Sequence, residues 1–195
     1  MNYLAHIYLS ESNYQFRVGN FMADAVKGRF AHRFPHMVSE GIRTHRFIDH
    51  YTDTHPLIKG FIEGMRPHFG RYSAIVLDIY LDHILAKNFR YFTNRSLRLF
   101  CYNFYFALLL NYRYLPDRFR RFIFHFMATD RLGSYSKESG VRESLEIMVE
   151  YRNLDIDVDS AMVFLRDREA DLFDLLECFI RELKEELRNQ QYISK

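Results

Sequence analysis

Residues 73–88 read S-A-I-V-L-D-I-Y-L-D-H-I-L-A-K-N. Drawn as an α-helix, this stretch is apolar around almost its whole circumference, which predicts a buried helix at the centre of the fold. It nevertheless contains Asp78, Asp82 and His83. The two aspartates are four residues apart, so they share one helix face. A buried carboxylate is costly unless it is paired or binds a metal. We therefore expect either a cation beside these two carboxylates, or neutralisation of their charge by a nearby basic side chain or helix N-terminus.

Length predicts a single domain, and the small number of Gly and Pro residues together with the lack of a long alternating stretch predicts an all-α helical bundle. The chain has 195 residues, of which 48% are hydrophobic, enough for a large core. We expect one helical domain over 1–195, with the site in 1–90 and scaffold helices in 91–195. No apolar run reaches the length of a membrane span, and the start of the chain lacks the basic flank of a signal peptide. Cys101 and Cys178 lie in apolar helical patterns without metal-ligand spacing, so we expect buried thiols in a cytoplasmic protein.

Charge is distributed unevenly along the chain. Residues 1–121 hold 17 Lys and Arg against 9 Asp and Glu, a balance of +8, whereas residues 122–195 hold 10 against 16, a balance of −6. The basic part favours an anionic partner, such as a phosphorylated substrate, an acidic protein or nucleic acid. Alternatively, the two parts simply pack against each other.

Hydrophobic periodicity and turn residues predict the helices. The tail pattern of Leu172, Leu175, Leu176, Phe179, Ile180, Leu183 and Leu187 is the clearest amphipathic helix. We expect a loose segment around Gly60, Gly64, Pro67 and Gly70, a loop over 131–140, and an N-cap in the acidic link 155–160. The other helices are predicted at 13–29, 35–55, 71–88, 95–111, 116–130 and 141–151.

A second polar stretch, residues 41–53, reads G-I-R-T-H-R-F-I-D-H-Y-T-D. His45, Asp49 and Asp53 recur every four residues and therefore follow one edge of the predicted helix. Imidazole and carboxylate ligands on one edge suit a hard or borderline divalent metal. The alternative is a solvated helix face with ordinary charge pairs.

A third stretch, G-N-F-M-A-D at residues 19–24, follows an apolar start that contains His6. Alone, Asp24 reads as an exposed acid and His6 as a core histidine. Acids and imidazoles on three helices nevertheless favour a metal site in a bundle core. The absence of thiolates at suitable spacing disfavours structural zinc and iron–sulfur clusters. Phosphate-binding glycine loops, a nucleophile elbow and H-E-x-x-H are missing.

These blocks resemble the acyl carrier protein phosphodiesterase family. The matching residues are M-N-Y-L-A-H at 1–6, G-N-F-M-A-D at 19–24, G-I-R-T-H-R-F-I-D at 41–49 with Thr52-Asp53, and D-I-Y-L-D-H at 78–83. The resemblance is specific over about residues 1–90. It implies an all-helical fold like that of the HD-domain phosphohydrolases, and removal of the 4′-phosphopantetheine arm from holo acyl carrier protein. Manganese is the implied metal, with Mg²⁺, Fe²⁺ or Zn²⁺ as alternatives. The chain has Asp49-His50 and Asp82-His83 but no His-Asp pair, so the superfamily ligand set cannot be copied.

The resemblance implies a pool of residues from which the metal ligands and their supporting carboxylates are drawn: His6, Asp24, His45, Asp49, Asp78 and Asp82. Within the same blocks, we assign Arg46 as a phosphate clamp, His83 as the acid that protonates the leaving serine oxygen, and Asp53 as a residue that orients Arg46 or His50.

The implied partner is an acidic carrier protein, which the basic part of the chain would attract. Candidate contacts are Arg17, Lys27, Arg29, Arg33 and Arg43. Nucleic acid has no supporting motif. Two alternatives stay open: a phosphohydrolase of the same fold acting on a small phosphorylated metabolite or nucleotide, and a helical binding module without turnover.

Overall fold

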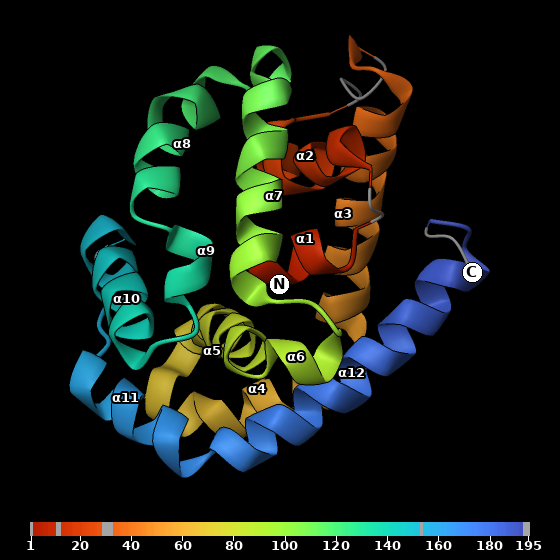
Figure 1. Cartoon of the computed structure of the whole chain (residues 1–195). Coiled ribbons are helices and arrows are strands. Elements are labelled where there is room, and N and C mark those ends of the chain that lie inside the picture. The colour runs from red at the N-terminus through yellow and green to blue at the C-terminus, as the bar shows by residue number, and fades with distance from the viewer. Residues whose placement is uncertain (1, 11–12, 29–32, 153, 193–195) are drawn as a thin grey trace.

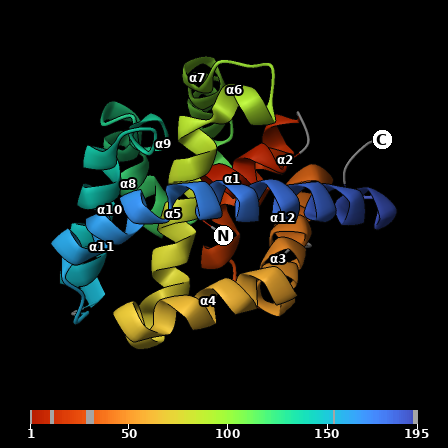
Figure 2. The same ribbon diagram turned by 90° about the horizontal axis from the view of Figure 1, so that it is seen from below.

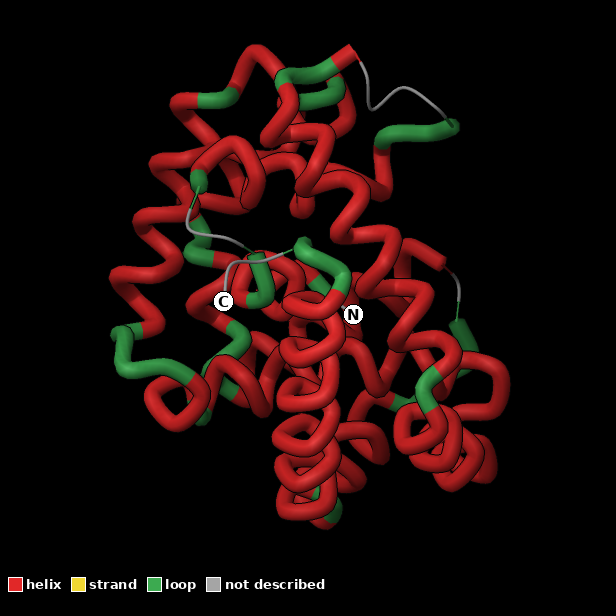
Figure 3. Tube along the Cα trace, turned by 90° about the vertical axis from the view of Figure 1, so that its right-hand side faces the viewer, coloured by secondary structure: helices red, strands yellow, loops and turns green. Residues whose placement is uncertain are grey.

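The computed structural model describes residues 2–10, 13–28, 33–152 and 154–192, and within these ranges the chain forms helices joined by loops, without a strand (Figure 3). Helix α5, most of whose side chains are buried, lies below α1 and α7 and above α4 and α12 in Figure 1. The bounds of the helices are α1 Tyr3–Tyr8, α2 Tyr14–Met22, α3 His36–Thr54, α4 Pro56–Phe69, α5 Ser73–Lys87, α6 Phe89–Phe92, α7 Leu97–Leu110, α8 Asp117–Ala128, α9 Arg131–Ser134, α10 Glu138–Arg152, α11 Val158–Asp167 and α12 Glu169–Asn189, with short 3₁₀ turns η1 Ala23–Ala25, η3 Gly70–Tyr72 and η4 Tyr112–Tyr114. The predicted all-α bundle is confirmed.

Helix α5 is the central buried helix that its composition predicts. Its neighbours α1, α4, α10 and α12 pack around it, and α12 crosses it on the outside (Figure 2). Apolar side chains such as Val76, Leu77 and Tyr80 are almost fully buried, and so are Asp82 and His83. Burying this surface is the main stabilising contribution of the helix.

Helices α2 and α3 share the most extensive contact between elements of the described residues, and two glycines allow their backbones to approach each other. A Cβ atom on Gly19 would lie 2.1 Å from the carbonyl oxygen of Val38. One on Gly41 would lie 2.0 Å from the carbonyl oxygen of Phe16. This contact brings the polar edge of α3 against the end of α2.

The predicted helices at 71–88, 95–111 and 116–130 correspond to α5, α7 and α8, and the amphipathic tail is α12. Asp157 caps α11, accepting hydrogen bonds from the backbone N–H groups of Asp159 and Ser160.

Two predictions about secondary structure are wrong. The expected loose segment is the helix α4, with Pro56 in its first turn and an apolar face that includes Ile58 and Met65. The expected loop 131–140 contains α9 and the start of α10.

No helix in the described ranges combines the length and the apolarity that a bilayer crossing requires.

Candidate metal centre

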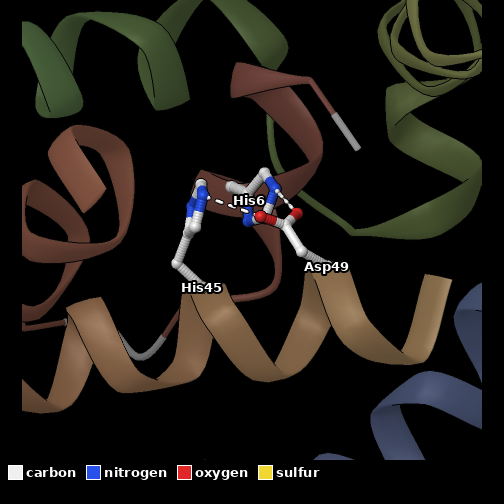
Figure 4. A group of neighbouring side chains, drawn as sticks. All are labelled: His6, His45 and Asp49. Carbon is white, nitrogen blue, oxygen red and sulfur yellow. Dashed lines mark ion pairs between the residues drawn. The ribbon is translucent and has the colours of Figure 1, made fainter. Parts of the chain in front are cut away.

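Three short segments bring the site together, and all three come from the first 49 residues of the chain. Helix α1 carries His6, the end of α2 and η1 carry Asn20 and Asp24, and α3 carries His45 and Asp49. Figure 4 shows the two imidazoles and the Asp49 carboxylate turned toward one another. One donor atom from each of these three side chains lies within 4.8 Å of the others.

Both imidazole Nε2 atoms face carboxylate oxygens. His6 Nε2 lies 3.1 Å from Oδ1 of Asp49, and His45 Nε2 lies 3.0 Å from Oδ2 of the same carboxylate. His45 Nε2 is also 3.1 Å from Oδ1 of Asp24. The two rings stack with centroids 4.0 Å apart. Four side chains therefore direct nitrogen and oxygen donors into one small volume.

Asn20 determines which ring nitrogen of each histidine carries the proton. Its Nδ2 donates to the carbonyl oxygen of His6 at 3.1 Å and to Oγ of Ser10 at 2.8 Å. This arrangement turns Oδ1 toward the histidines, where Nδ1 of His6 lies at 3.0 Å and Nδ1 of His45 at 3.2 Å. Because an amide oxygen only accepts, both Nδ1 atoms must donate. In the neutral rings, both Nε2 lone pairs therefore point at the carboxylates.

This arrangement fits a divalent cation. Lone pairs facing carboxylate oxygens repel unless a proton or a metal ion lies between them. Nε2 of His6 is fully buried and makes no hydrogen bond of acceptable geometry, despite its closeness to Asp49. Two imidazoles and one or two carboxylates form a mixed N and O donor set that suits Mn²⁺, Fe²⁺ or Zn²⁺.

The pKa values follow burial and these contacts. Burial lowers the pKa of His6 to about 4. Burial also opposes charge on His45, but hydrogen bonds to Asp24 and Asp49 outweigh it and raise the pKa of His45 to about 9. For Asp49, burial works against ionisation, yet its contacts with His45 and His6 hold its pKa below the ordinary value. The hydrogen bond from His45 lowers the pKa of Asp24. The centre therefore favours ionised carboxylates, which are the metal-binding form.

A cavity of about 320 Å³ opens beside these residues, and we call it the metal cavity. Its lining includes His6, Asn20, Asp24, His45 and Asp78. Asp78 is half-buried, and burial raises the pKa of its carboxyl. The structure thus brings five of the six residues in the predicted ligand pool to one place.

The sixth, Asp82, lies elsewhere in the structure. It is fully buried, and its two oxygens accept hydrogen bonds from the backbone N–H groups of Leu4 at 2.9 Å and Ala5 at 3.0 Å. These groups belong to the first turn of α1, where a carboxylate is favoured. Asp82 therefore holds the helix that carries His6 through its backbone, a role different from the metal binding or the orientation of water and imidazoles that the sequence interpretation proposed. Burial raises its pKa to about 7.

The three residues predicted for catalysis are not in the lining of the metal cavity. Arg46 donates from Nη2 to the carbonyl oxygens of Val26 at 2.9 Å and Gly28 at 3.0 Å, just after η1. His83 is buried, and its Nδ1 donates to the carbonyl oxygen of Tyr135 at 2.7 Å. Asp53 is exposed one turn beyond Asp49 on α3. Their catalytic roles stay predictions.

The predicted partner contacts differ in exposure. Lys27, Arg33 and Arg43 are exposed, and Arg43 forms an ion pair with Glu40. Arg17 is only 6% exposed, and its guanidinium lies over the ring of Phe100, which argues against contact with a partner. Arg29 lies outside the described residues.

Asn20 is the functional residue that sequence reasoning missed. It lies inside the quoted block 19–24, but an asparagine is not a usual metal ligand, and its hydrogen bonds to His6 and His45 become visible only in the folded structure.

Together, the fold and the site define the class of protein: a helical bundle with a candidate metal centre made of imidazole and carboxylate donors.

Comparison with known proteins gives the family. The family model for acyl carrier protein phosphodiesterase matches residues 1–183, and the chain belongs to this family. Similar proteins named acyl carrier protein phosphodiesterase occur in Enterobacter sp. (strain 638), at 39% identity, and in Yersinia pestis, at 38%. Each alignment covers 88 residues, 45% of this chain and 46% of the relative. The matched part thus spans about half the length of these curated relatives. No solved structure matches the chain.

Proposed function

We propose that this protein is a metal-dependent phosphodiesterase. It would hydrolyse the phosphodiester between 4′-phosphopantetheine and the serine of holo acyl carrier protein, giving apo acyl carrier protein and 4′-phosphopantetheine. The observation that carries the proposal is the convergence of His6, His45 and Asp49 beside an open cavity. The membership of the acyl carrier protein phosphodiesterase family supports the choice of acyl carrier protein as the substrate.

His6, His45 and Asp49 would hold the metal, with Asp24 as a further ligand beside His45. The mixed imidazole and carboxylate donors suit Mn²⁺, Fe²⁺ or Zn²⁺, and we propose Mn²⁺ among them because it is the metal that the resemblance to the family implies. When bound, a divalent cation would lower the pKa of a water molecule towards about 7 and neutralise charge on phosphoryl oxygens.

The remaining residues prepare the reaction. In the neutral form of each ring, Asn20 keeps the proton on Nδ1, so the lone pair of Nε2 is directed at the centre and is available to a metal that displaces the second proton of His45. Asp78 lines the same cavity, and burial raises its pKa, which makes it a stronger base than an exposed aspartate. In this proposal Asp78 orients the attacking water and accepts its proton.

The partner would be an acidic carrier protein. Lys27 and Arg33 are exposed between η1 and α3, and Arg43 is exposed on α3, two residues before His45. Their positive charge would speed the encounter with an acidic protein and make it sensitive to salt.

The test is mass spectrometry of holo acyl carrier protein incubated with the purified protein and Mn²⁺. We expect loss of the arm, and a large loss of rate in Asp49→Ala. The matched control is Asp174→Ala, an exposed aspartate on α12, which should behave as the unsubstituted protein. Carrier protein that stays intact while small phosphodiesters are cleaved would favour a small-molecule phosphohydrolase. A protein that neither binds metal nor cleaves either substrate would be a binding module.

A further inference from the structure

A second cavity, of about 260 Å³, adjoins the metal cavity, and we call it the aromatic cavity. Its walls come from α8, α9 with the following turn, and α10, and include Phe122, Phe126, Tyr135 and Ile147. Four residues line both cavities: Asn2, Tyr3, Ile79 and Met148. The two cavities therefore share one wall, and a ligand bound in one reaches the other by passing these four side chains.

The chemistry of the two cavities differs. The metal cavity gathers Asp24, Asp78 and the two histidines. The aromatic cavity contains one guanidinium, that of Arg131, and its charge is compensated by Glu143 at 2.7 Å. The metal cavity therefore suits the charged reacting group, whereas the aromatic cavity suits a neutral one.

The aromatic cavity nevertheless contains polar groups that can meet amides. The side chain of Asn2 donates to the hydroxyl of Tyr135 at 3.2 Å, and Arg131 donates from Nη2 to Oγ of Ser144 at 2.9 Å. Pockets for small molecules commonly combine apolar walls with a few such polar groups, and the volume of about 260 Å³ is just below their usual range of about 300–1,000 Å³. The occupant is therefore narrow, mostly apolar and interrupted by hydrogen-bonding groups.

We propose that the aromatic cavity binds the pantetheine arm of the substrate while the phosphodiester lies in the metal cavity. Pantetheine is a neutral, unbranched chain apart from two methyl groups, and it contains two amides. It is joined directly to the phosphate that reacts, so its place must be next to the metal cavity. This inference rests on the proposed function, which supplies an arm-bearing substrate. It adds that the arm, and not only the carrier protein surface, is recognised.

The experiment narrows the cavity from two sides with Ile147→Trp and Thr129→Trp. Both positions line the aromatic cavity, neither lines the metal cavity, and both are exposed, so the larger side chains need not disturb the core. Val163→Trp on α11 is the matched control, since Val163 and Ile147 are each 51% exposed. Circular dichroism and melting temperature verify that all three variants fold.

Calorimetry with free pantetheine measures the arm alone and needs no catalysis. We expect binding to the unsubstituted protein and to Val163→Trp, and at least about tenfold weaker binding to Ile147→Trp and Thr129→Trp. In the hydrolysis assay, the kcat/KM for holo acyl carrier protein should fall by a similar factor relative to that for an aryl phosphodiester. Pantetheine binding that is absent, or equal in all four proteins, would overturn the proposal.

The same pair of assays separates the two proposals. Holo acyl carrier protein that is hydrolysed equally by all variants, without pantetheine binding, removes the arm site and keeps the phosphodiesterase. Pantetheine that binds as expected to a protein unable to cleave holo acyl carrier protein removes the proposed function and keeps the binding site. Faster cleavage of acylated carrier protein that depends on Ile147, with no binding of free pantetheine, would assign the cavity to an acyl chain instead.

Discussion

The side-chain oxygen of Asn20 accepts hydrogen bonds from Nδ1 of His6 and Nδ1 of His45. These two hydrogen bonds orient both rings so that their Nε2 atoms can bind a cation. Replacing Asn20 with alanine removes the constraint on both rings. We expect Asn20→Ala to weaken Mn²⁺ binding by about 10–100-fold, as loss of a residue that orients metal-bound histidines typically does. Metal titration followed by calorimetry measures the effect.

Asn111→Ala is the matched control for that prediction. Asn111 is also buried and also donates its side-chain amide to a backbone carbonyl, at the end of α7 and away from the site. Equal metal affinity in both variants would show that Asn20 does not orient the histidines.

Asp82 stabilises the first turn of α1 through two hydrogen bonds. An asparagine in its place directs an N–H₂ group at one backbone N–H, leaving it unsatisfied. We therefore expect Asp82→Asn to lower the free energy of unfolding by about 1–3 kcal/mol, measured by urea denaturation against Asp174→Asn. Unchanged stability combined with lost metal binding would instead place Asp82 among the ligands.

His83 predicts a pH dependence of stability. Burial lowers its pKa below the ordinary value of 6.5. Because the folded state binds the proton less well, the contribution of His83 is fully present above pH 6.5 and is lost as the pH falls below that value. We expect urea denaturation to show a smaller loss of stability between about pH 7.5 and about pH 5.5 in His83→Gln than in the unsubstituted protein. An identical loss in both would show that His83 is not the group that titrates.

At the level of single residues, spacing was informative where the contacts are local. His45 and Asp49 are one turn apart on α3, and their cooperation follows from that spacing. The bonds of Asp82 to α1 join residues 77 and 78 positions apart, so no local pattern reveals them. The same holds for His6, which reads as a core histidine until α2 and α3 come beside it.

Among the elements, the contact between α2 and α3 positions the site, and Gly41 permits it. An added Cβ would meet the backbone of Phe16, which cannot move aside as a side chain would. We expect Gly41→Ala to separate the helices, to destabilise the protein by about 1–3 kcal/mol, and to weaken metal binding because His45 moves away from Asn20. Urea denaturation and metal titration measure the two effects.

Gly60→Ala on α4 is the control substitution, because an added Cβ there has no neighbour within 4 Å. It should stabilise the protein by about 0.5–1 kcal/mol, since alanine favours a helix over the unfolded chain. Equal responses of the two glycines would mean that the close approach of α2 and α3 is not needed.

Helix α4 also shows where local sequence is a poor guide. Gly60, Gly64 and Pro67 read as helix breakers, and each does weaken a helix by propensity alone. In the folded protein, Ile58, Met65 and Phe69 lie buried on one face of α4. Burial of that face outweighs propensity, and such tertiary stabilisation cannot be judged before the neighbouring helices are known.

At the scale of the whole molecule, the candidate metal centre brings together side chains from helices that are separated by loops in the sequence. Its donors come from α1, η1 and α3, while α5 supports α1 through Asp82 and lines the cavity through Asp78. That the whole functional site lies in residues 1–90 stays a prediction, and Met148 of α10 also lines the metal cavity. The remaining helices supply the core and, through α8 and α10, the walls of the aromatic cavity.

A cation that joins these elements should stabilise the folded state, because the unfolded chain does not hold His6, His45 and Asp49 together. At a free Mn²⁺ concentration about 100 times the dissociation constant, the expected stabilisation is about 2.7 kcal/mol, which raises the melting temperature by several degrees. Chelation should reverse the rise, and Asp49→Ala should abolish it while Asp174→Ala keeps it. A melting temperature of the unsubstituted protein that does not respond to Mn²⁺, Fe²⁺, Mg²⁺ or Zn²⁺ would contradict the metal centre, because binding to the folded state alone must stabilise it.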